Sequence, residues 1–452
     1  MPTLQTGIDD VLSKPPVLNV FLGTRPVGQI IGLPGDKNTF AFFESYLEDR
    51  NRPIVSLGFK GPGGIIAYKQ RVRQTKVDPF FSNLLPEGPL RAYAAGRNGI
   101  HPDREFHLLR ILGEDLPGAV VVRPAEDAPP TDEGLAAPPA GQSASDTNAP
   151  VKFSLAGVQM KLSALRKVAG GLTIPASGKG GRWIVKFPSE RFQAVPENEF
   201  WMMTMARRIG LDVPDIDLVP IDSIVGLPPG IRTDLGRALA IRRFDRTEAG
   251  GRIHMEDFAQ IFRIYPHDKY DKANFDRIGE VIFSELGEEG LQDYVARLVF
   301  TAAIGNGDMH VKNWSILYTG IGPRLAPVYD YLSTLTYVSG IEDLGMNLGG
   351  SKRFSDIDDD LFARFADNAR LPGTLVHKVV GETVKRVTDA WAEIRKEAEL
   401  PRILIKAIDT HMATLPIMKR DTLITTKFLQ AGRPSDRKDV STLKQPQKRP
   451  GN

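Results

Sequence analysis

Two short stretches decide the fold of this chain: Gly305-Asn306-Gly307-Asp308-Met309-His310-Val311-Lys312-Asn313-Trp314-Ser315 and Val328-Tyr329-Asp330. An aspartate, an asparagine five residues later and a second aspartate after the next strand form the layout of a phosphoryl-transfer site. In that layout Asp308 accepts the proton of the acceptor hydroxyl, while Asn313 and Asp330 hold magnesium against nucleotide phosphates. Magnesium takes hard oxygen ligands and few of them from protein, so this small set suffices. The competing interpretation is a polar loop between two apolar segments.

Composition sets broad limits on the class of protein. The chain has 452 residues, enough for two or three domains with separate cores. A formal net charge of +3 is too small to argue for nucleic-acid binding by itself. The absence of cysteine excludes disulfides, thiolate nucleophiles and cysteine-ligated metal centres.

The amino-terminal residues do not follow the pattern of a targeting segment. Met1 to Pro16 carries Asp9 and Asp10 and lacks a basic start followed by an apolar run, so we do not expect a signal peptide. No stretch reaches the length of a membrane span. We therefore expect a cytoplasmic protein.

Alternating apolar residues and turn signals predict a compact α+β module in residues 1–123. Its expected elements are a hairpin (Leu18–Leu22 and Val27–Ile31), strands at Ile54–Phe59, Ile65–Tyr68 and Ala119–Val122, and helices at Arg91–Arg97 and Phe106–Leu112. Residues 124–150 consist almost wholly of small, polar and proline residues, which predicts a linker. The basic tail 432–452 is expected to be disordered, with electrostatic attachment to an acidic partner or to nucleic acid as the alternative.

The remaining chain predicts a two-lobed order. Residues 151–250 are rich in expected strands, with Lys161–Leu165, Trp183–Phe187 and Arg237–Phe244 the clearest, and a helix at Asn198–Ile209. Residues 251–431 are mostly helical, and within them two strands, Trp314–Tyr318 and Arg324–Tyr329, precede Asp330. A β-rich part before a helical part, with acidic and metal-binding residues opening the second, is the order of a kinase.

Three further motifs have both a functional and a plain interpretation. Small residues in Ser154–Lys161 let backbone N–H groups approach an anion, although a β-turn also explains them. Lys186 is a lone cation in an apolar strand; it fits either a phosphate-binding lysine paired with Glu199 or a surface lysine. His310 either orients the Asp308 loop or, if protonated, contacts a phosphate. Lys312 either neutralises the transferred phosphoryl group or is an exposed lysine.

Taken together, these motifs resemble the HipA toxin kinases, the serine/threonine kinase halves of type II toxin–antitoxin systems. The resemblance extends through most of the chain and rests on Pro79–Gly88, Ser154–Lys161, Lys186-Phe187-Pro188, Asn198-Glu199-Phe200, Arg243-Phe244-Asp245-Arg246, Glu256-Asp257-Phe258, Asp308–Asn313 and Tyr329-Asp330. It implies an α+β, two-lobed protein-kinase-like fold with an amino-terminal α+β module and a helical carboxy-terminal lobe.

The resemblance also implies a role for individual residues. Asp308 would be the catalytic base, Asn313 and Asp330 the magnesium ligands, and Ser154 an autophosphorylated serine that switches the enzyme off. The expected ATP contacts are the phosphate loop Ala156, Gly157, Val158, Gln159, Met160 and Lys161, the lysine Lys186, the hinge Arg242, Arg243 and Phe244, and His310, Val311, Lys312, Asn313, Tyr329 and Asp330.

Implied cofactors are ATP and Mg²⁺. Implied partners are a HipB-like helix-turn-helix antitoxin, an aminoacyl-tRNA synthetase as protein substrate, and operator DNA reached mainly through the antitoxin. Two other functions stay open: a small-molecule phosphotransferase of the aminoglycoside-kinase type, suggested by His310, and a non-catalytic component of a repressor complex.

Overall fold

The amino-terminal module is built on one antiparallel sheet. The structure is a computed structural model that describes residues 15–125, 161–166, 172–174, 180–227, 236–337 and 343–420. The sheet has the order β4-β3-β2-β1-β5, from strands β1 (Val17–Leu22), β2 (Arg25–Leu33), β3 (Lys37–Phe42), β4 (Arg73–Gln74) and β5 (Val120–Pro124). The expected hairpin is confirmed, because β1 and β2 pair antiparallel from Val17–Ile31 to Leu22–Arg25.

Helices cover this sheet with aromatic side chains. They are α1 (Glu44–Glu48), α2 (Pro79–Ser82), α3 (Gly88–Arg97) and α4 (Glu105–Leu112). Phe80 and Phe81 of α2 are fully buried against Phe40 and Phe59. The expected helices at Arg91–Arg97 and Phe106–Leu112 and the strand at Ala119–Val122 are confirmed.

Two expected strands of the module are wrong. Ile54–Phe59 contains a 3-10 turn at Leu57–Phe59, and Ile65–Tyr68 makes a single bridge, from Ile66 to Lys60. The physical reason for the first is that the N–H of Leu57 donates to Glu256 Oε1 at 2.8 Å and so does not enter a strand ladder.

The next part of the chain forms a second antiparallel sheet, of order β7-β6-β8-β10-β9. Its strands are β6 (Lys161–Arg166), β7 (Leu172–Thr173), β8 (Trp183–Lys186), β9 (Ile216–Pro220) and β10 (Arg237–Arg242), and helix α5 (Val195–Arg208) packs on it. Lys161 and Lys186 are directly opposite in β6 and β8. Their side chains therefore leave the same face of the sheet.

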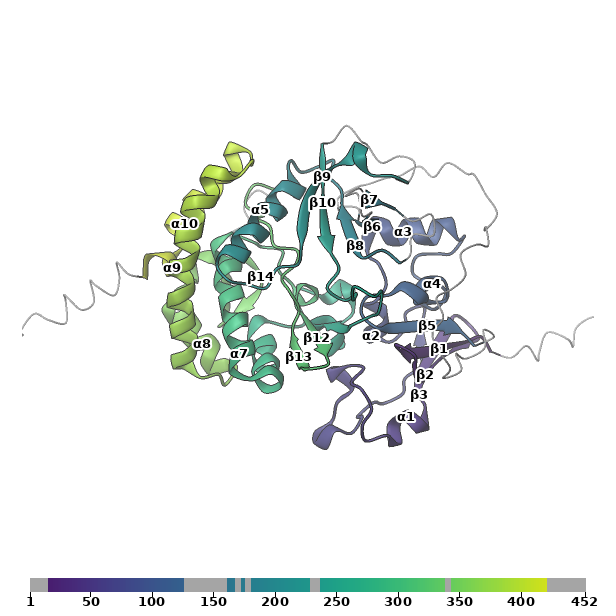
Figure 1. The fold of residues 1–452 in the computed structure, drawn as a ribbon. Helices are drawn as coiled ribbons and strands as arrows, with labels where there is room; N and C mark the ends of the chain where they lie inside the picture. The colour runs from purple at the N-terminus through teal and green to yellow at the C-terminus, as the bar shows by residue number, and fades with distance from the viewer. Residues whose placement is uncertain are drawn as a thin grey trace, which may run out of the picture.

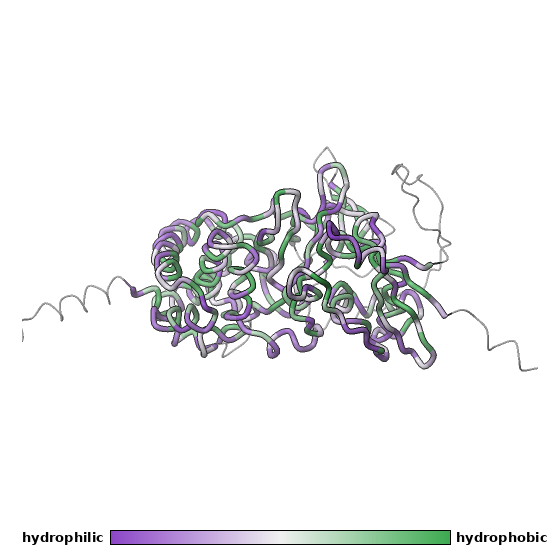
Figure 2. Tube along the Cα trace, turned by 90° about the horizontal axis from the view of Figure 1, so that it is seen from below, coloured by the Kyte–Doolittle hydropathy of each residue, from purple (hydrophilic) through white to green (hydrophobic). Residues whose placement is uncertain are grey.

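The last part is dominated by helices, as expected (Figure 1). They are α6 (Phe258–Ile261), α7 (Phe275–Ala303), α8 (Asp359–Asn368), α9 (Gly373–Glu397) and α10 (Arg402–Thr414), with the small strands β11 (His254–Asp257), β12 (Ser315–Thr319), β13 (Gly322–Leu325), β14 (Asp343–Leu348) and β15 (Ser351–Arg353). Apolar and polar residues alternate along the helical traces in Figure 2, and α9 buries Val376, Val380, Val384 and Val387 on one face.

The expected strand Arg324–Tyr329 is wrong beyond Leu325, where β13 ends. Pro327 has no N–H to donate, and the N–H of Val328 donates to Asp212 O at 2.8 Å instead of to a strand. The chain then reaches Asp330 in irregular backbone. No helix within the described ranges combines the length and apolar composition needed to cross a membrane.

Candidate active site

Asn306 joins the two segments that carry the carboxylates. Helix α7 ends at Ala303, and Gly305, two residues later, has a φ of +64° and faces Leu335 closely enough to exclude a Cβ atom. The buried Asn306 side chain then accepts from the N–H of Asp308 at 3.0 Å and donates to the carbonyl of Asp330 at 3.3 Å. Asn306 thereby fixes the Asp308 loop against the Asp330 segment. The role of Asn306 was not predicted from the sequence, although an asparagine between two glycines just before Asp308 was the available signal.

Asp330 lies at the centre of a cluster of cations and amides. Its carboxylate bonds to Lys186 Nζ, lies 3.4 Å from Lys161 Nζ, and accepts from Asn313 Nδ2 at 3.0 Å. Lys186 also pairs with Glu199 of α5, and both of these side chains are buried. Asp330 has a φ of 59°, the left-handed conformation that strained functional positions often adopt.

Electrostatic attraction between opposite charges keeps Lys186 and Asp330 ionised. Burial works against the ammonium form of Lys186, but Asp330 and Glu199 together raise its pKa. Burial likewise works against the carboxylate of Asp330, but Lys161 and Lys186 hold its pKa below the usual range. Burial also raises the pKa of Glu199, and the Lys186 ammonium opposes that rise. Lys186 and Asp330 are therefore the members of the cluster that carry charge at neutral pH, with Glu199 hydrogen-bonded to the lysine.

Asp308 is exposed and accepts a hydrogen bond at Oδ1 from the hydroxyl of Tyr270. Part of the Asp308 residue reaches solvent, but partial burial of its carboxyl group raises the pKa of that group. The hydrogen bond from Tyr270 opposes this rise. Tyr270 was not identified from the sequence, because it lies 38 residues before Asp308 in a segment without a recognised motif.

His310 is neutral and serves the loop. Burial lowers its pKa to about 3, so the protonated, phosphate-contacting role does not fit neutral pH. Its backbone N–H donates to Asn313 Oδ1 at 2.9 Å and thereby orients that amide. The neighbouring Val311 is buried, and its N–H donates to the carbonyl of Lys269.

The ammonium of Lys312 is held by the amino-terminal module. Its Nζ lies 3.1 Å from Asn83 Oδ1 and 2.9 Å from Glu87 Oε1. Glu87 also pairs with Lys269 at 3.1 Å. Burial favours the neutral form of Glu87, but the two lysines lower its pKa to about 2. A charge-neutralising role for Lys312 at the phosphoryl group would require it to leave these partners.

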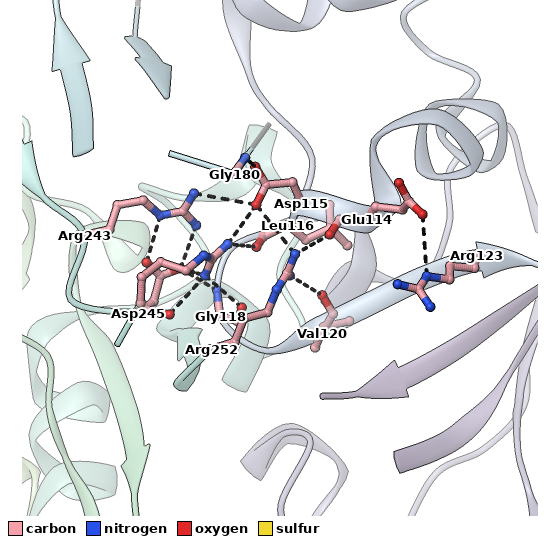
Figure 3. A network of polar contacts seen from close by, with 11 residues as sticks. Glu114, Asp115, Leu116, Gly118, Val120, Arg123, Gly180, Arg243, Asp245 and Arg252 are labelled. Carbon is pink, nitrogen blue, oxygen red and sulfur yellow. Dashed lines mark hydrogen bonds and ion pairs between the residues drawn. The ribbon is translucent and has the colours of Figure 1, made fainter. Parts of the chain in front are cut away.

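The expected hinge divides into two parts. The ring of Phe244 lies 5.7 Å from that of Tyr329, whose hydroxyl donates to Lys312 O at 2.9 Å. The two arginine side chains are not brought to the carboxylate cluster. Arg242 pairs with Asp215 and Glu248 at the surface, and Arg243 pairs with Asp245 and Asp115 (Figure 3).

The expected autophosphorylation site and most of the phosphate loop, Ser154, Ala156, Gly157, Val158, Gln159 and Met160, lie outside the described residues. Lys161, the last residue of the loop, begins β6 and is aimed at Asp330. Of the residues expected to contact the nucleotide phosphates, the structure brings together Lys161, Lys186 and Asp330.

The donor set suits magnesium better than a metal that needs a full protein cage. Asn313 and Asp330 lie side by side, because Asn313 Nδ2 donates to Asp330 Oδ2 at 3.0 Å. The oxygens of this amide and this carboxylate are the candidate ligands. Across the described ranges, no group of three or more His, Cys, Asp or Glu side chains could hold a metal ion. Two protein ligands completed by phosphate and water oxygens are the usual arrangement for magnesium.

The two-lobed fold and this cluster define a kinase-like protein. The HipA N-terminal domain model matches residues 18–123, and the HipA-like C-terminal domain model matches residues 153–391. The chain therefore belongs to the HipA family.

Relatives and a solved structure agree with this family. The chain is 46% identical over 413 residues to a Sinorhizobium fredii protein named "Putative kinase Y4dM", covering 90% of this chain and 99% of the relative. It is 27% identical over 351 residues to the serine/threonine-protein kinase toxin HipA of Shewanella oneidensis, covering 71% and 77%. A chain of the solved Shewanella oneidensis complex of HipA, HipB and operator DNA aligns with a TM-score of 0.65 at 22% identity, covering 89% and 97%. The expected α+β, two-lobed kinase-like fold of the HipA type is confirmed.

Proposed function

We propose that the protein is a serine/threonine protein kinase toxin that transfers the γ-phosphate of ATP to a protein hydroxyl. The observation that carries the proposal is that Lys186, Glu199 and Asp330 meet in one charged cluster, and that Asn306 ties this cluster to the Asp308 loop. This is the arrangement that kinases use to hold phosphates beside a catalytic base.

Each residue then has a defined task. Lys186 and Lys161 hold the nucleotide phosphates, and Asp308 takes the proton of the attacking hydroxyl. Magnesium, held by Asn313 and Asp330, would neutralise charge on the phosphates. Phe244, from the hinge, and Tyr329, whose ring lies against it, would contact the nucleotide, and the Tyr329 hydroxyl also donates to the carbonyl of Lys312.

Partners and regulation follow from the family. The Shewanella oneidensis protein of similar fold was solved in complex with HipB and operator DNA, which supports a HipB-like antitoxin here and operator DNA reached mainly through it. The expected protein substrate is an aminoacyl-tRNA synthetase, whose modification would arrest translation and growth. Ser154 is the expected site of self-inactivation, because a phosphate beside the phosphate loop adds nearly two negative charges next to a polyanion.

The test uses γ-labelled ATP, magnesium and a bacterial extract. Purified protein should label itself and one discrete extract protein, which mass spectrometry would identify, and the self-label should fall on Ser154. Label on a small molecule would favour the aminoglycoside-kinase alternative. Binding of an antitoxin with no labelling at all would favour a non-catalytic component of a repressor complex.

A further inference from the structure

Tyr270 hydrogen-bonds to one of the two oxygens of the Asp308 carboxylate and leaves the other without a side-chain partner among the described residues. Its hydroxyl donates to Oδ1. Among the residues with described positions, no other side chain bonds to this carboxylate, so Oδ2 stays available. A general base needs a fixed orientation and one oxygen within reach of the proton that it accepts.

The Tyr270 ring is held from two sides. The Tyr270 ring packs edge-on to the His310 ring, with the two ring centroids 5.0 Å apart. Lys269 Nζ lies 5.6 Å from the centroid of the Tyr270 ring. Lys269 is paired in turn with Glu87, at the start of α3 in the amino-terminal module. A continuous set of contacts therefore runs from the module through Glu87, Lys269 and Tyr270 to Asp308.

We propose that Tyr270 is a positioning residue for phosphoryl transfer that holds Asp308 by Oδ1 and leaves Oδ2 for the acceptor hydroxyl, and that Glu87 secures Tyr270 through Lys269. The inference rests on the proposed kinase function. If so, the amino-terminal module contributes to catalysis by positioning Asp308, through Glu87, Lys269 and Tyr270.

The chemical step uses the free oxygen. The acceptor hydroxyl oxygen bonds to the γ-phosphorus, and the bond from that phosphorus to the β–γ bridging oxygen breaks. ADP leaves with that electron pair, and the hydroxyl proton passes to Asp308 Oδ2. Tyr270 keeps its proton throughout, because burial and the adjacent Asp308 carboxylate raise the pKa of its phenol.

The variant Tyr270→Phe tests this role, since it removes the hydroxyl and keeps the ring. We expect an about 10- to 100-fold loss of kcat for self-labelling and for ATP hydrolysis, with an unchanged KM for ATP. Tyr265→Phe is the matched control, because its hydroxyl bonds to Val77 O in the same segment, away from Asp308. That control should keep wild-type kcat.

The pH profile separates positioning from a merely structural role. The charged groups facing Asp308 are Lys269, Lys161 and Asp330, and the Tyr270 hydrogen bond lowers the pKa of Asp308. Losing that bond should raise this pKa, so the acid limb of kcat should move to higher pH in Tyr270→Phe. A folded variant with unchanged kcat and unchanged limb would overturn the inference. A faster variant would also overturn it, by showing that Tyr270 blocks the acceptor position.

A second variant tests the part assigned to the module. Glu87→Gln keeps the size of the side chain but loses its charge on Lys269 and Lys312. We expect a several-fold loss of kcat and a lower thermal midpoint, because the ionised Glu87 carboxylate stabilises the fold at neutral pH. Full kcat in Glu87→Gln would overturn the role of the module while leaving that of Tyr270. A wild-type protein that binds magnesium-ATP but transfers phosphate to nothing would overturn the proposed function itself.

Discussion

The hydroxyl of Ser56 donates to Glu256 Oε2 at 2.6 Å, across 200 residues of sequence. Both side chains are buried, and Leu57 N and the Tyr318 hydroxyl donate to the other carboxylate oxygen. The amino-terminal module is thus joined to β11 by a buried, polar contact. Such a contact specifies one geometry of the two parts, because a displaced module would leave a buried carboxylate without partners.

A pH dependence follows from this contact. Burial raises the pKa of Glu256 from its usual 4.5 to about 7. Between these values the folded state binds a proton that the unfolded state lacks, so this group's contribution to stability is full below pH 4.5 and is lost as pH rises through 7. The loss is on the order of 3 kcal/mol.

The variant Glu256→Gln should remove that dependence. Urea unfolding at pH 5, 6, 7 and 8 should give a difference between variant and wild type that shifts in favour of the variant as pH rises. Comparing the two proteins cancels the opposite effect of His254, whose pKa burial lowers to about 4. A difference that stays constant over this range would contradict the assignment.

Asp115 supplies a second junction, beside the hinge (Figure 3). It lies 2.9 Å from Arg246, 3.6 Å from Arg252 and 3.8 Å from Arg243. Asp115→Ala would leave three clustered guanidinium groups with one carboxylate fewer, and we expect a loss of about 3 kcal/mol or more in unfolding free energy. Glu397→Ala, which removes an exposed partner of Arg208, is the control and should leave the thermal midpoint unchanged. Equal midpoints for both variants would show that the junction contributes no stability.

The sequence was most informative where the chemistry is local. Asp308 and Asn313 lie within one short loop, and it was their spacing together with Asp330 after the next strand that predicted the chemistry. The Lys186–Glu199 pair was one of the two interpretations offered by a strand followed by a helix, and the structure shows it. Tyr270 and Glu87 were not predicted as site residues, because they reach the loop only through tertiary packing between elements far apart in sequence. The strand errors at Ile54–Phe59 and Arg324–Tyr329 have the same origin: their N–H groups donate to distant residues.

Asp308→Asn should abolish transfer and spare the fold. The amide oxygen can still accept from Tyr270, but the amide cannot take up a proton, so we expect a fall in kcat of about 100-fold or more. Magnesium-ATP should raise the thermal midpoint of this variant as much as that of wild type, because ligand binding stabilises the native state by mass action. In a bacterial host, wild type should arrest growth and the variant should not. Arrest by both proteins would show that the effect is not phosphoryl transfer.

Lys186 and Glu199 allow stability and function to be separated. Lys186→Met leaves Glu199 buried without its countercharge, and we expect a loss of about 3–5 kcal/mol in unfolding free energy. Asp330 suffers less, since Lys161 remains 3.4 Å away. The double variant Lys186→Met/Glu199→Met replaces the pair with apolar groups and should regain much of that stability. It should not regain transfer, because the phosphate-binding cation is gone.

The control for this pair is Lys60→Met. Lys60 pairs with Glu285 at 2.8 Å but is half-exposed, so its loss should cost less than about 1 kcal/mol and leave transfer intact. Urea unfolding and γ-label incorporation would be measured on all four proteins, together with the midpoint shift produced by magnesium-ATP. A double variant that is stable and still transfers phosphate would remove Lys186 from the phosphate site. If Lys186→Met were as stable as wild type, Glu199 would be neutral in the folded protein. Lys186 and Glu199 would then not form an ion pair, and the kinase interpretation of this cluster depends on that pair.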